Sequence, residues 1–276
     1  MNIDLHTHST FSDGALCPAE LAARAAAAGV EVLALTDHDT VAGIEEAAHA
    51  ARALGLALVP GVEISAAWRA QTLHVLGLWI DPGAAELRAA LVAQGERRQV
   101  RMRKMCARLT KAGLPGAALL AEVEAQPGLP TRTHLAHALV AGGHVGRTDE
   151  AFRKYLKYGK SAHVPADWPG LETVVGWIRA AGGVAALAHP ARYPLSAGAR
   201  RRLLADFLAA GGTALEVVSG GNGLQHTGAV AALAVKYGFM GSVGSDFHDP
   251  ELTWNPLGRS LKLPDGVIPV WRGKYP

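Results

Sequence analysis

The chain opens with Met1-Asn-Ile-Asp-Leu-His6-Thr-His8-Ser-Thr-Phe-Ser-Asp13-Gly14, the stretch that decides how the rest is interpreted. Residues 2–5 predict a short, half-buried strand. Alternate side chains of a strand share one face, so His6 and His8 are expected to point the same way. Asp13 follows in a Ser-Asp-Gly turn, which can bring its carboxylate back toward them. Two imidazoles at a strand end predict a site for a metal ion.

Composition sets the class of protein. The chain has 276 residues, of which 49% are hydrophobic, enough for one large barrel-type domain. A net charge of +3 is compatible with an anionic substrate but does not indicate a dedicated nucleic-acid surface. The N-terminus resembles no signal peptide, and no apolar run is long enough for a bilayer. With Cys17 and Cys106 as its only cysteines, we expect a cytoplasmic protein with reduced thiols, no membrane partner and no evident obligate protein partner.

The first third of the chain alternates between strand and helix patterns. Strands are predicted at 31–36, 56–62 and 73–80, because these apolar runs have strand length and turn residues at their ends. Helices are predicted at 18–28 and 40–54, with Thr40 as the N-cap of the second. This rhythm predicts parallel strands with helices outside.

Residues 81–170 interrupt the rhythm and are predicted to form an inserted helical subdomain, with helices at 84–111, 131–141 and 149–156. The alternation then resumes with helices at 171–181, 199–210 and 224–236 and strands at 184–188, 214–218 and 239–243. An irregular, proline-containing tail is expected to wrap the barrel. We therefore predict an α/β fold, a seven-stranded TIM-like (β/α) barrel built from residues 1–80 and 171–276, with residues 81–170 capping it.

Nine side chains carry the predicted chemistry, and most follow the C-terminal end of a predicted strand, where barrel active sites are built. His74 is the exception, near the start of its strand. All nine offer nitrogen or oxygen, which suits manganese, zinc or iron rather than calcium. They exceed what one ion accepts, so two or three ions are expected, with Glu63 as the bridging ligand. The set is His6, His8, Asp13, His38, Glu63, His74, His189, Asp246 and His248. Closely spaced ions that activate water and neutralise charge indicate hydrolysis of a phosphate ester.

Five motifs carry a resemblance to a known family: His6-Thr-His8, Thr36-Asp37-His38-Asp39, Gly61-Val-Glu63, Ala188-His189-Pro190 and Ser245-Asp246-Phe-His248. They resemble the metal motifs of the PHP (polymerase and histidinol phosphatase) family, within the amidohydrolase-like barrels. The resemblance implies a distorted seven-stranded barrel with two or three ions, often Mn²⁺, with zinc, iron or magnesium as alternatives. It implies one ion on His6, His8, Glu63 and Asp246, a second on Asp13, His38 and His248, and a third on Glu63, His74 and His189.

The predicted insert is similar to one subgroup of that family, through Arg97 to Arg103, Thr131-Arg132-Thr-His134 and Phe152 to Lys160. Members hydrolyse nucleoside 3′,5′-bisphosphates, such as adenosine 3′,5′-bisphosphate, to the 5′-monophosphate and phosphate. The resemblance implies attack by a metal-bound hydroxide. Apart from the resemblance, the sequence predicts that Thr131 is the N-cap of a helix. A helix N-terminus with an arginine beside it, here Arg132, is typical of an anion site. Substrate contacts are expected from Asp13, Gln99, Val100, Arg101, Met102, Arg132, His134 and Lys157.

Several alternatives stay open at this point. The substrate could instead be the 5′ end of short RNA, or histidinol phosphate, and a nucleic-acid-binding module without catalysis is a third class. The proton for the leaving group could come from His189, from Asp246 or from a metal-bound water. Asp37 and Asp39 fit either a role in orienting imidazoles or a place at a helix N-terminus. The basic face of Arg97, Arg101, Lys104 and Arg108 fits solvent or a second phosphate equally well. Surface or packing roles are expected for His49, His137, His144, His163 and His226.

Overall fold

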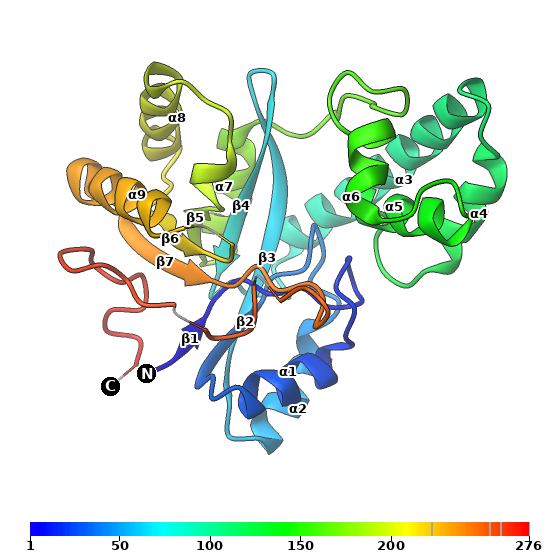
Figure 1. Ribbon diagram of the computed structural model, residues 1–276. Helices are drawn as coiled ribbons and strands as arrows, with labels where there is room; N and C mark the ends of the chain where they lie inside the picture. Colours follow the sequence, from blue (N-terminus) through cyan, green and yellow to red (C-terminus); the bar gives the residue numbers. More distant parts are fainter. Residues whose placement is uncertain (222, 254, 260, 276) are drawn as a thin grey trace.

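Seven strands form one sheet in the computed structural model, in the order β1 to β7 along the chain (Figure 1). The structure describes residues 1–221, 223–253, 255–259 and 261–275. The strands are β1 (Ile3–Asp4), β2 (Val32–Leu35), β3 (Ala57–Trp68), β4 (Gln71–Leu78), β5 (Val184–Leu187), β6 (Ala214–Ser219) and β7 (Met240–Gly244). The Leu5 amide donates to the Val243 carbonyl at 3.0 Å, and Thr7 forms a parallel bridge with Phe247. The first and last strands therefore meet, and the predicted seven-stranded barrel is confirmed.

Two of the strand pairings are antiparallel, which corrects the expectation of parallel pairing throughout. β3 pairs with β4 in antiparallel register, and so does β4 with β5. Only residues 69 and 70 separate β3 from β4, so no crossover helix can return the chain to a parallel start. As a consequence, the beginning of β4 lies where the parallel strands end. His74 pairs opposite Ser65, two residues beyond Glu63 on β3, which explains its apparently exceptional place.

Five helices accompany the barrel strands: α1 (Pro18–Ala27), α2 (Ile44–Ala53), α7 (Leu171–Ala180), α8 (Ala197–Ala209) and α9 (Leu224–Tyr237) (Figure 1). The prediction of Thr40 as an N-cap is wrong, because α2 begins at Ile44 after Gly43. The Thr40 hydroxyl accepts from the Ala42 amide at 3.2 Å, a local bond that favours a turn over a helix start. None of the described helices is both long and apolar enough to cross a membrane.

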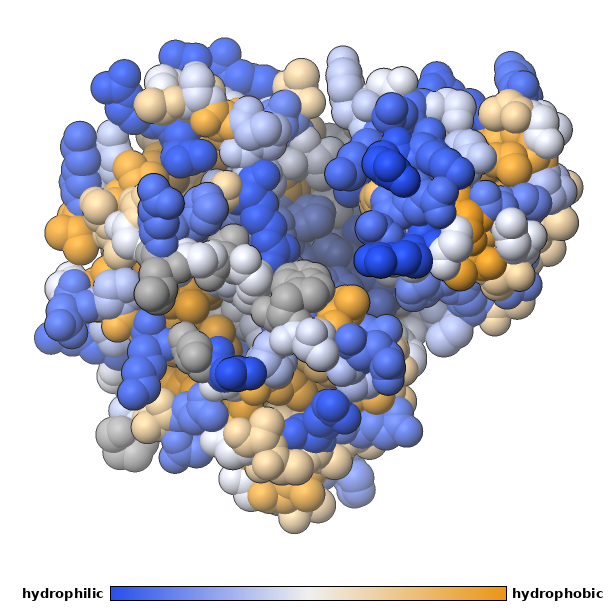
Figure 2. All heavy atoms as spheres, viewed as in Figure 1, coloured by the Kyte–Doolittle hydropathy of each residue, from blue (hydrophilic) through white to orange (hydrophobic). Residues whose placement is uncertain are grey.

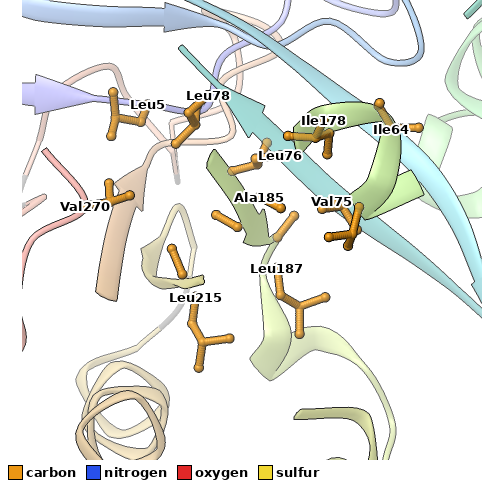
Figure 3. Close-up of a cluster of buried hydrophobic side chains, with 14 of the residues drawn as sticks. Leu5, Ile64, Val75, Leu76, Leu78, Ile178, Ala185, Leu187, Leu215 and Val270 are labelled. Carbon is orange, nitrogen blue, oxygen red and sulfur yellow. The ribbon is translucent and has the colours of Figure 1, made fainter. Parts of the chain in front are cut away.

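The barrel core consists mainly of aliphatic side chains from the strands and from the helices that pack on them. Figure 3 shows Leu5, Leu76, Leu78 and Leu187 among them, with Ile178 of α7 packing from outside. All five are fully buried. Each such side chain contributes roughly 1.5–3 kcal/mol relative to an exposed position. This core holds the strands in register and so sets the spacing of the groups at their ends.

Residues 85–156 form the helical segment between β4 and α7. It contains α3 (Ala85–Lys111), α4 (Gly116–Ala125), α5 (Arg132–Ala141), α6 (Thr148–Ala151) and a π-helix (Phe152–Leu156). α4 was not predicted, because Gly113 and Gly116 indicate a loop, yet the helix starts at Gly116 itself. α3 spans two packed clusters: Leu87 and Leu91 join the barrel core, whereas its second half packs with α4 and α5.

Candidate metal and phosphate site

The nine predicted side chains converge on one region, although they come from six segments of the chain: 6–13, 38, 63, 74, 189 and 246–248. Seven of them fall into three overlapping groups, and within each group the donor atoms lie within 4.8 Å of one another. The groups are His6, His8 and Glu63; His8, Asp13, His38 and His248; and His38, Glu63 and His74. His189 and Asp246 border them through contacts to Glu63, His6 and His8. In the sets that the resemblance implied, Glu63 alone belongs to two, whereas in these groups His8, His38 and Glu63 each belong to two.

Glu63 is the centre of the cluster. Its Oε2 lies 3.3 Å from Nε2 of both His6 and His8 and 2.9 Å from His38 Nδ1. Its Oε1 lies 3.0 Å from His74 Nδ1 and 3.1 Å from His189 Nε2. Donor atoms bound to one ion at about 2.0–2.2 Å lie roughly 3 Å apart. The carboxylate is therefore placed to contribute one oxygen to each of two neighbouring sites.

The remaining acids lie on either side of Glu63. Asp246 Oδ1 lies 3.3 Å from Nε2 of both His6 and His8. Asp13 Oδ1 lies 3.4 Å from His248 Nε2 and 3.8 Å from His38 Nε2. Each carboxylate thus faces two imidazoles, the mixed donor set that first-row divalent metals accept.

The cluster fits a cation because several of its polar atoms have no hydrogen-bond partner in the structure. Asp13 Oδ1, His38 Nδ1, Glu63 Oε2 and His74 Nδ1 are buried and unpartnered. The close approaches of Glu63 to His38 Nδ1 and His74 Nδ1 lack hydrogen-bond angles. Such buried groups are costly unless something else satisfies them. A divalent ion would do so.

Burial also keeps two of the imidazoles neutral. It lowers the pKa of His8 to about 3, with the neighbouring His248 acting in the same direction. Burial likewise lowers the pKa of His74 to about 4, against the pull of Glu63. A metal binds the neutral imidazole, so these two side chains need not release a proton at neutral pH.

Glu216 of β6 supports the cluster from behind and was not predicted. Its Oε1 lies 2.8 Å from His6 Nδ1, and its Oε2 accepts from the His189 amide at 2.5 Å. The His6 contact places a proton on Nδ1 and leaves the Nε2 lone pair facing Glu63. A lone acid within the apolar run Ala214-Leu-Glu216-Val-Val218 is a signal that could have identified it.

Replacing Glu216 by Gln is expected to weaken metal binding about 10- to 100-fold, because His6 loses the carboxylate that orients its ring. Manganese titration of activity, with metal content measured in parallel, tests this expectation. Glu172→Gln on the exposed surface of α7 is the matched control. Equal metal affinity in the two variants would contradict the orienting role.

Three residues at the rim of the barrel, in or next to the cluster of metal-type donors, have a strained backbone conformation. Asp39, His189 and Asp246 have positive φ angles of 53°, 31° and 55°. Residues other than glycine adopt this region at a cost that surrounding contacts must offset. Arg192 supplies one such contact, since its guanidinium reaches both the Asp246 carboxylate and the Gly220 carbonyl. Nothing in the sequence around Arg192 indicated this role.

Asp37 and Asp39 both hold neighbouring segments in place, whereas no described imidazole donates to either carboxylate, so the predicted orienting role has no direct contact behind it. Asp37 accepts from the Ser9 amide at 2.7 Å and the Ser9 and Ser12 hydroxyls at 2.6 and 2.7 Å. It thereby fixes the loop between His8 and Asp13. Neither carboxylate lies at a helix N-terminus, because α2 starts only at Ile44.

Asp39 joins the barrel to α3 through a buried ion pair. Its Oδ2 accepts from Arg98 Nε at 2.7 Å, and its Oδ1 accepts from Gln94 Nε2 at 3.1 Å. Neither Arg98 nor Gln94 was predicted, because their partner Asp39 lies far away in the sequence. Both occupy positions of the stripe formed by Leu87, Leu91, Met102 and Met105, where polar residues are unexpected and therefore informative.

Three arginines line one small cavity at the N-terminus of α5. The cavity is lined by Arg98, Arg101, Met102, Met105, Pro130, Thr131 and Arg132. Burial and the facing guanidiniums lower the pKa of Arg101 to about 10 and also lower the pKa of Arg132. Neither of these two has a carboxylate within 4 Å among the described residues, whereas Arg98 has Asp39. Arg101 of α3 is half-buried, and Arg132 at the start of α5 is exposed. Two guanidiniums without a close carboxylate, beside a helix N-terminus, favour a phosphate.

The predicted N-cap of α5 is confirmed, and it involves His134. The Thr131 hydroxyl accepts from the amides of Thr133 and His134 at 3.1 and 3.4 Å. His134 Nδ1 in turn accepts from the Thr131 amide at 3.0 Å. His134 therefore has a structural bond through Nδ1, and only Nε2 is left for any contact with a substrate.

The other expected substrate contacts lie in different surroundings. Gln99, Val100 and Lys157 are exposed, and Met102 is buried in the cluster of the helical segment. The basic face of α3 is divided: Arg101 donates to the Val164 carbonyl at 3.1 Å, and Arg108 donates to the His163 carbonyl. The five histidines predicted to have surface or packing roles belong to none of the three donor groups found among the described residues.

Comparisons with known proteins agree with this arrangement. The family model named PHP domain matches residues 4–126. A 3′,5′-nucleoside bisphosphate phosphatase of Chromobacterium violaceum is 44% identical over 98% of this chain and 95% of that protein. A 5′-3′ exoribonuclease of Haemophilus influenzae is 45% identical over 97% of each chain. A solved structure of an amidohydrolase from Chromobacterium violaceum, with bound sulfate and no metal, covers 99% of this chain and 95% of that one with a TM-score of 0.93 and 43% identity.

Proposed function

Because the chain belongs to the PHP family, we propose that it is a metal-dependent phosphomonoesterase that converts nucleoside 3′,5′-bisphosphates to 5′-monophosphates and phosphate. One observation carries the choice of substrate: Arg132 has no carboxylate within 4 Å among the described residues, yet it is near enough to Asp13 of the metal-type cluster for that carboxylate to act on its pKa. A substrate with two phosphates satisfies both. The relative from Chromobacterium violaceum is named for this activity.

Two or three divalent ions would be held by the nine residues of the cluster, with Glu63 shared between sites and Mn²⁺ as the proposed metal. When bound, such ions activate water and neutralise the charge on a phosphate. The donors are consistent with zinc, iron or magnesium as well, since nitrogen and oxygen sites accept several of these ions.

The protein's own side chains position the substrate. We assign the phosphate that is not cleaved to Arg101, Arg132 and the N-terminus of α5, with residues 81–170 acting as a cap over the barrel. Asp13, Gln99, Val100, Met102, His134 and Lys157 complete the proposed surroundings of the nucleoside. Figure 2 shows a recess with hydrophilic surroundings between the lobe of α3 to α6 and the rest of the molecule.

The leaving 3′ oxygen needs a proton, and His189 and Asp246 are the two side chains proposed near it. Asp246 contacts Arg192 and faces two imidazoles, an environment that keeps a carboxylate ionised. His189 has a buried Nδ1 without a partner. His189 is therefore the favoured proton donor.

Phosphate release from adenosine 3′,5′-bisphosphate in manganese tests the proposed function, with adenosine 3′-monophosphate and histidinol phosphate as comparisons. A preference of about 10-fold or more for the bisphosphate is expected, since a charged hydrogen bond contributes roughly 1.5–3 kcal/mol. Equal rates on histidinol phosphate would favour that alternative. The name of the Haemophilus relative favours a second candidate, removal of 5′ nucleotides from short RNA, in which the same ester oxygen leaves.

Substituting Arg132 by Gln is expected to lower kcat/KM for the bisphosphate by about 10- to 100-fold, through the lost bond to the second phosphate. Hydrolysis of the 3′-monophosphate is expected to change less than about 3-fold, because that substrate lacks the group in question. Arg153→Gln, an exposed position in the π-helix, is the control. If both substrates lost rate equally, Arg132 would not be the anion contact.

A further inference from the structure

Two loops that are far apart in the sequence pack against each other. One is residues 9–13, the Asp13 loop, which follows β1 and ends at that carboxylate. The other is residues 126–131, the α4–α5 loop, which leads directly into the N-terminus of α5 (Figure 1). The Leu129 amide donates to the Phe11 carbonyl at 3.1 Å. The segment that places the proposed phosphate site therefore contacts the segment that places a proposed metal ligand.

Gly128 lets the two backbones approach more closely than any other residue would. Its φ angle is +82°, and a Cβ at this position would lie 2.5 Å from the Thr10 carbonyl oxygen and 2.7 Å from the Ser12 carbonyl oxygen. Both distances are below the 3.0 Å that Cβ atoms respect, and both neighbours are backbone atoms. A side chain at position 128 would therefore require the Asp13 loop to move.

Arg98 provides a second connection between the α4–α5 loop and the cluster. Its Nη1 donates to the Pro130 carbonyl at 3.5 Å, and its Nε pairs with Asp39 at 2.7 Å. Asp39 directly follows His38, which belongs to the same donor group as Asp13. The α4–α5 loop is thus connected to that donor group by two separate routes.

Electrostatics favours joint occupation of the two sites. Asp13 is near enough to Arg132 for its carboxylate to favour the charged guanidinium. A divalent ion on Asp13 would offset this attraction and repel Arg132. A phosphate at Arg132 and the N-terminus of α5 supplies negative charge that relieves the repulsion. An ion at Asp13 and a phosphate at Arg132 therefore favour each other.

We propose that the α4–α5 loop is a positioning element that couples the two parts of the site, a role that rests on the proposed function. A phosphate at the start of α5 fixes this loop, the loop holds the Asp13 loop in place, and the ion bound by Asp13, His38 and His248 is held more tightly. By thermodynamic linkage, the same ion tightens phosphate binding by the same factor. A nucleotide without the second phosphate then loses contacts and also meets a weaker metal site.

Gly128→Ala tests the positioning role without changing any charge. It is expected to weaken the binding of one manganese ion about 10-fold, as changes behind metal ligands do. The electron paramagnetic resonance signal of free Mn²⁺ measures this without reference to activity. Gly113→Ala is the matched control, because Gly113 has a φ of +84° in the same helical segment, yet a Cβ there would meet no atom of the described residues within 4 Å. Equal manganese affinity in the two variants would overturn the positioning role.

A second variant covers the case in which Gly128→Ala does not fold, which circular dichroism shows. Leu129 packs against α3, where a Cβ at Gly95 would lie 3.3 Å from its Cδ2. Leu129→Ala removes this support of the α4–α5 loop and leaves the backbone contact unobstructed. Its manganese affinity is then compared with the same control, and a loss in the same direction is expected. No loss would overturn the proposal equally.

Adenosine 5′-monophosphate carries the phosphate that is not cleaved and tests the coupling. In the unmodified protein it is expected to lower the Kd of one manganese ion about 5-fold or more, and manganese should lower the Kd of the nucleotide by the same factor in calorimetry. Adenosine is the control compound, and the manganese–nucleotide complex is measured without protein. Gly128→Ala should bring the factor close to 1.

The outcomes separate the coupling from the proposed function. A nucleotide that binds without changing the manganese affinity would overturn the coupling, and an unchanged factor in Gly128→Ala would show that charge alone connects the sites. A nucleotide that does not bind at all would contradict the proposed phosphate site. In that case the comparison of Gly128→Ala with Gly113→Ala still decides whether the α4–α5 loop positions the metal ligands.

Discussion

Glu63→Gln is expected to abolish most of the activity, lowering kcat by at least about 1000-fold, equivalent to roughly 4 kcal/mol of transition-state stabilisation. The amide keeps the size of the side chain but removes the negative charge. Five imidazoles, those of His6, His8, His38, His74 and His189, lie within 3.3 Å of the Glu63 carboxylate oxygens. Their shared counter-charge is lost, so metal occupancy is expected to fall as well. Phosphate release and metal content by elemental analysis measure the two effects.

The substitution should leave the fold in place, because Glu63 is surrounded by site residues rather than by the apolar core. Circular dichroism on the variant checks this. Glu45→Gln on the exposed surface of α2 is the matched control and should keep full activity. A Glu63→Gln protein that retains both its metal and its rate would refute the bridging role.

Arg98→Met is expected to have the largest effect on stability, lowering the free energy of unfolding by about 3–5 kcal/mol. Arg98 and Asp39 are both buried, and their atoms lie 2.7 Å apart. Without the guanidinium, Asp39 would be an unpaired charge inside the protein. Arg98 also bonds the Ser65 hydroxyl at 3.0 Å, so α3 loses a second link to the barrel. Urea denaturation followed by fluorescence measures the change.

The double variant Asp39→Asn/Arg98→Met shows how much of the lost stability comes from leaving the Asp39 carboxylate without its partner. It is expected to be more stable than Arg98→Met alone, because no uncompensated carboxylate is left. Arg97→Met, at the neighbouring position of α3, controls for the loss of a positive charge. Three variants of equal stability would show that the ion pair contributes nothing measurable.

Much of the site could be predicted from the sequence because its ligands follow strand signals. His38 comes directly after a buried apolar run, and so do His189 and Asp246. The carboxyl ends of parallel strands share one rim, so short-range pattern is enough to bring these side chains together. The same logic predicted the N-cap at Thr131, which depends on four consecutive residues.

Residues whose role depends on another segment could not be predicted in this way. Arg98 lies 59 residues from its partner Asp39, and Glu216 lies 210 residues from His6. The secondary-structure propensity of a short segment contains no information about such long-range contacts. The sequence does mark both as polar positions inside apolar stripes, which is a signal of burial but not of the partner.

The amino-acid sequence by itself therefore determined the barrel, its seven strands and the identity of the nine clustered side chains, because hydrophobic periodicity and turn residues act locally. Tertiary structure alone decided that β4 runs antiparallel, which brings His74 to the rim. It also decided that Glu216 contacts His6 and that Arg98 connects α3 to the barrel. These features arise from contacts between segments that are far apart in the sequence. Such segments come together only in the folded protein, so local sequence patterns do not predict their contacts.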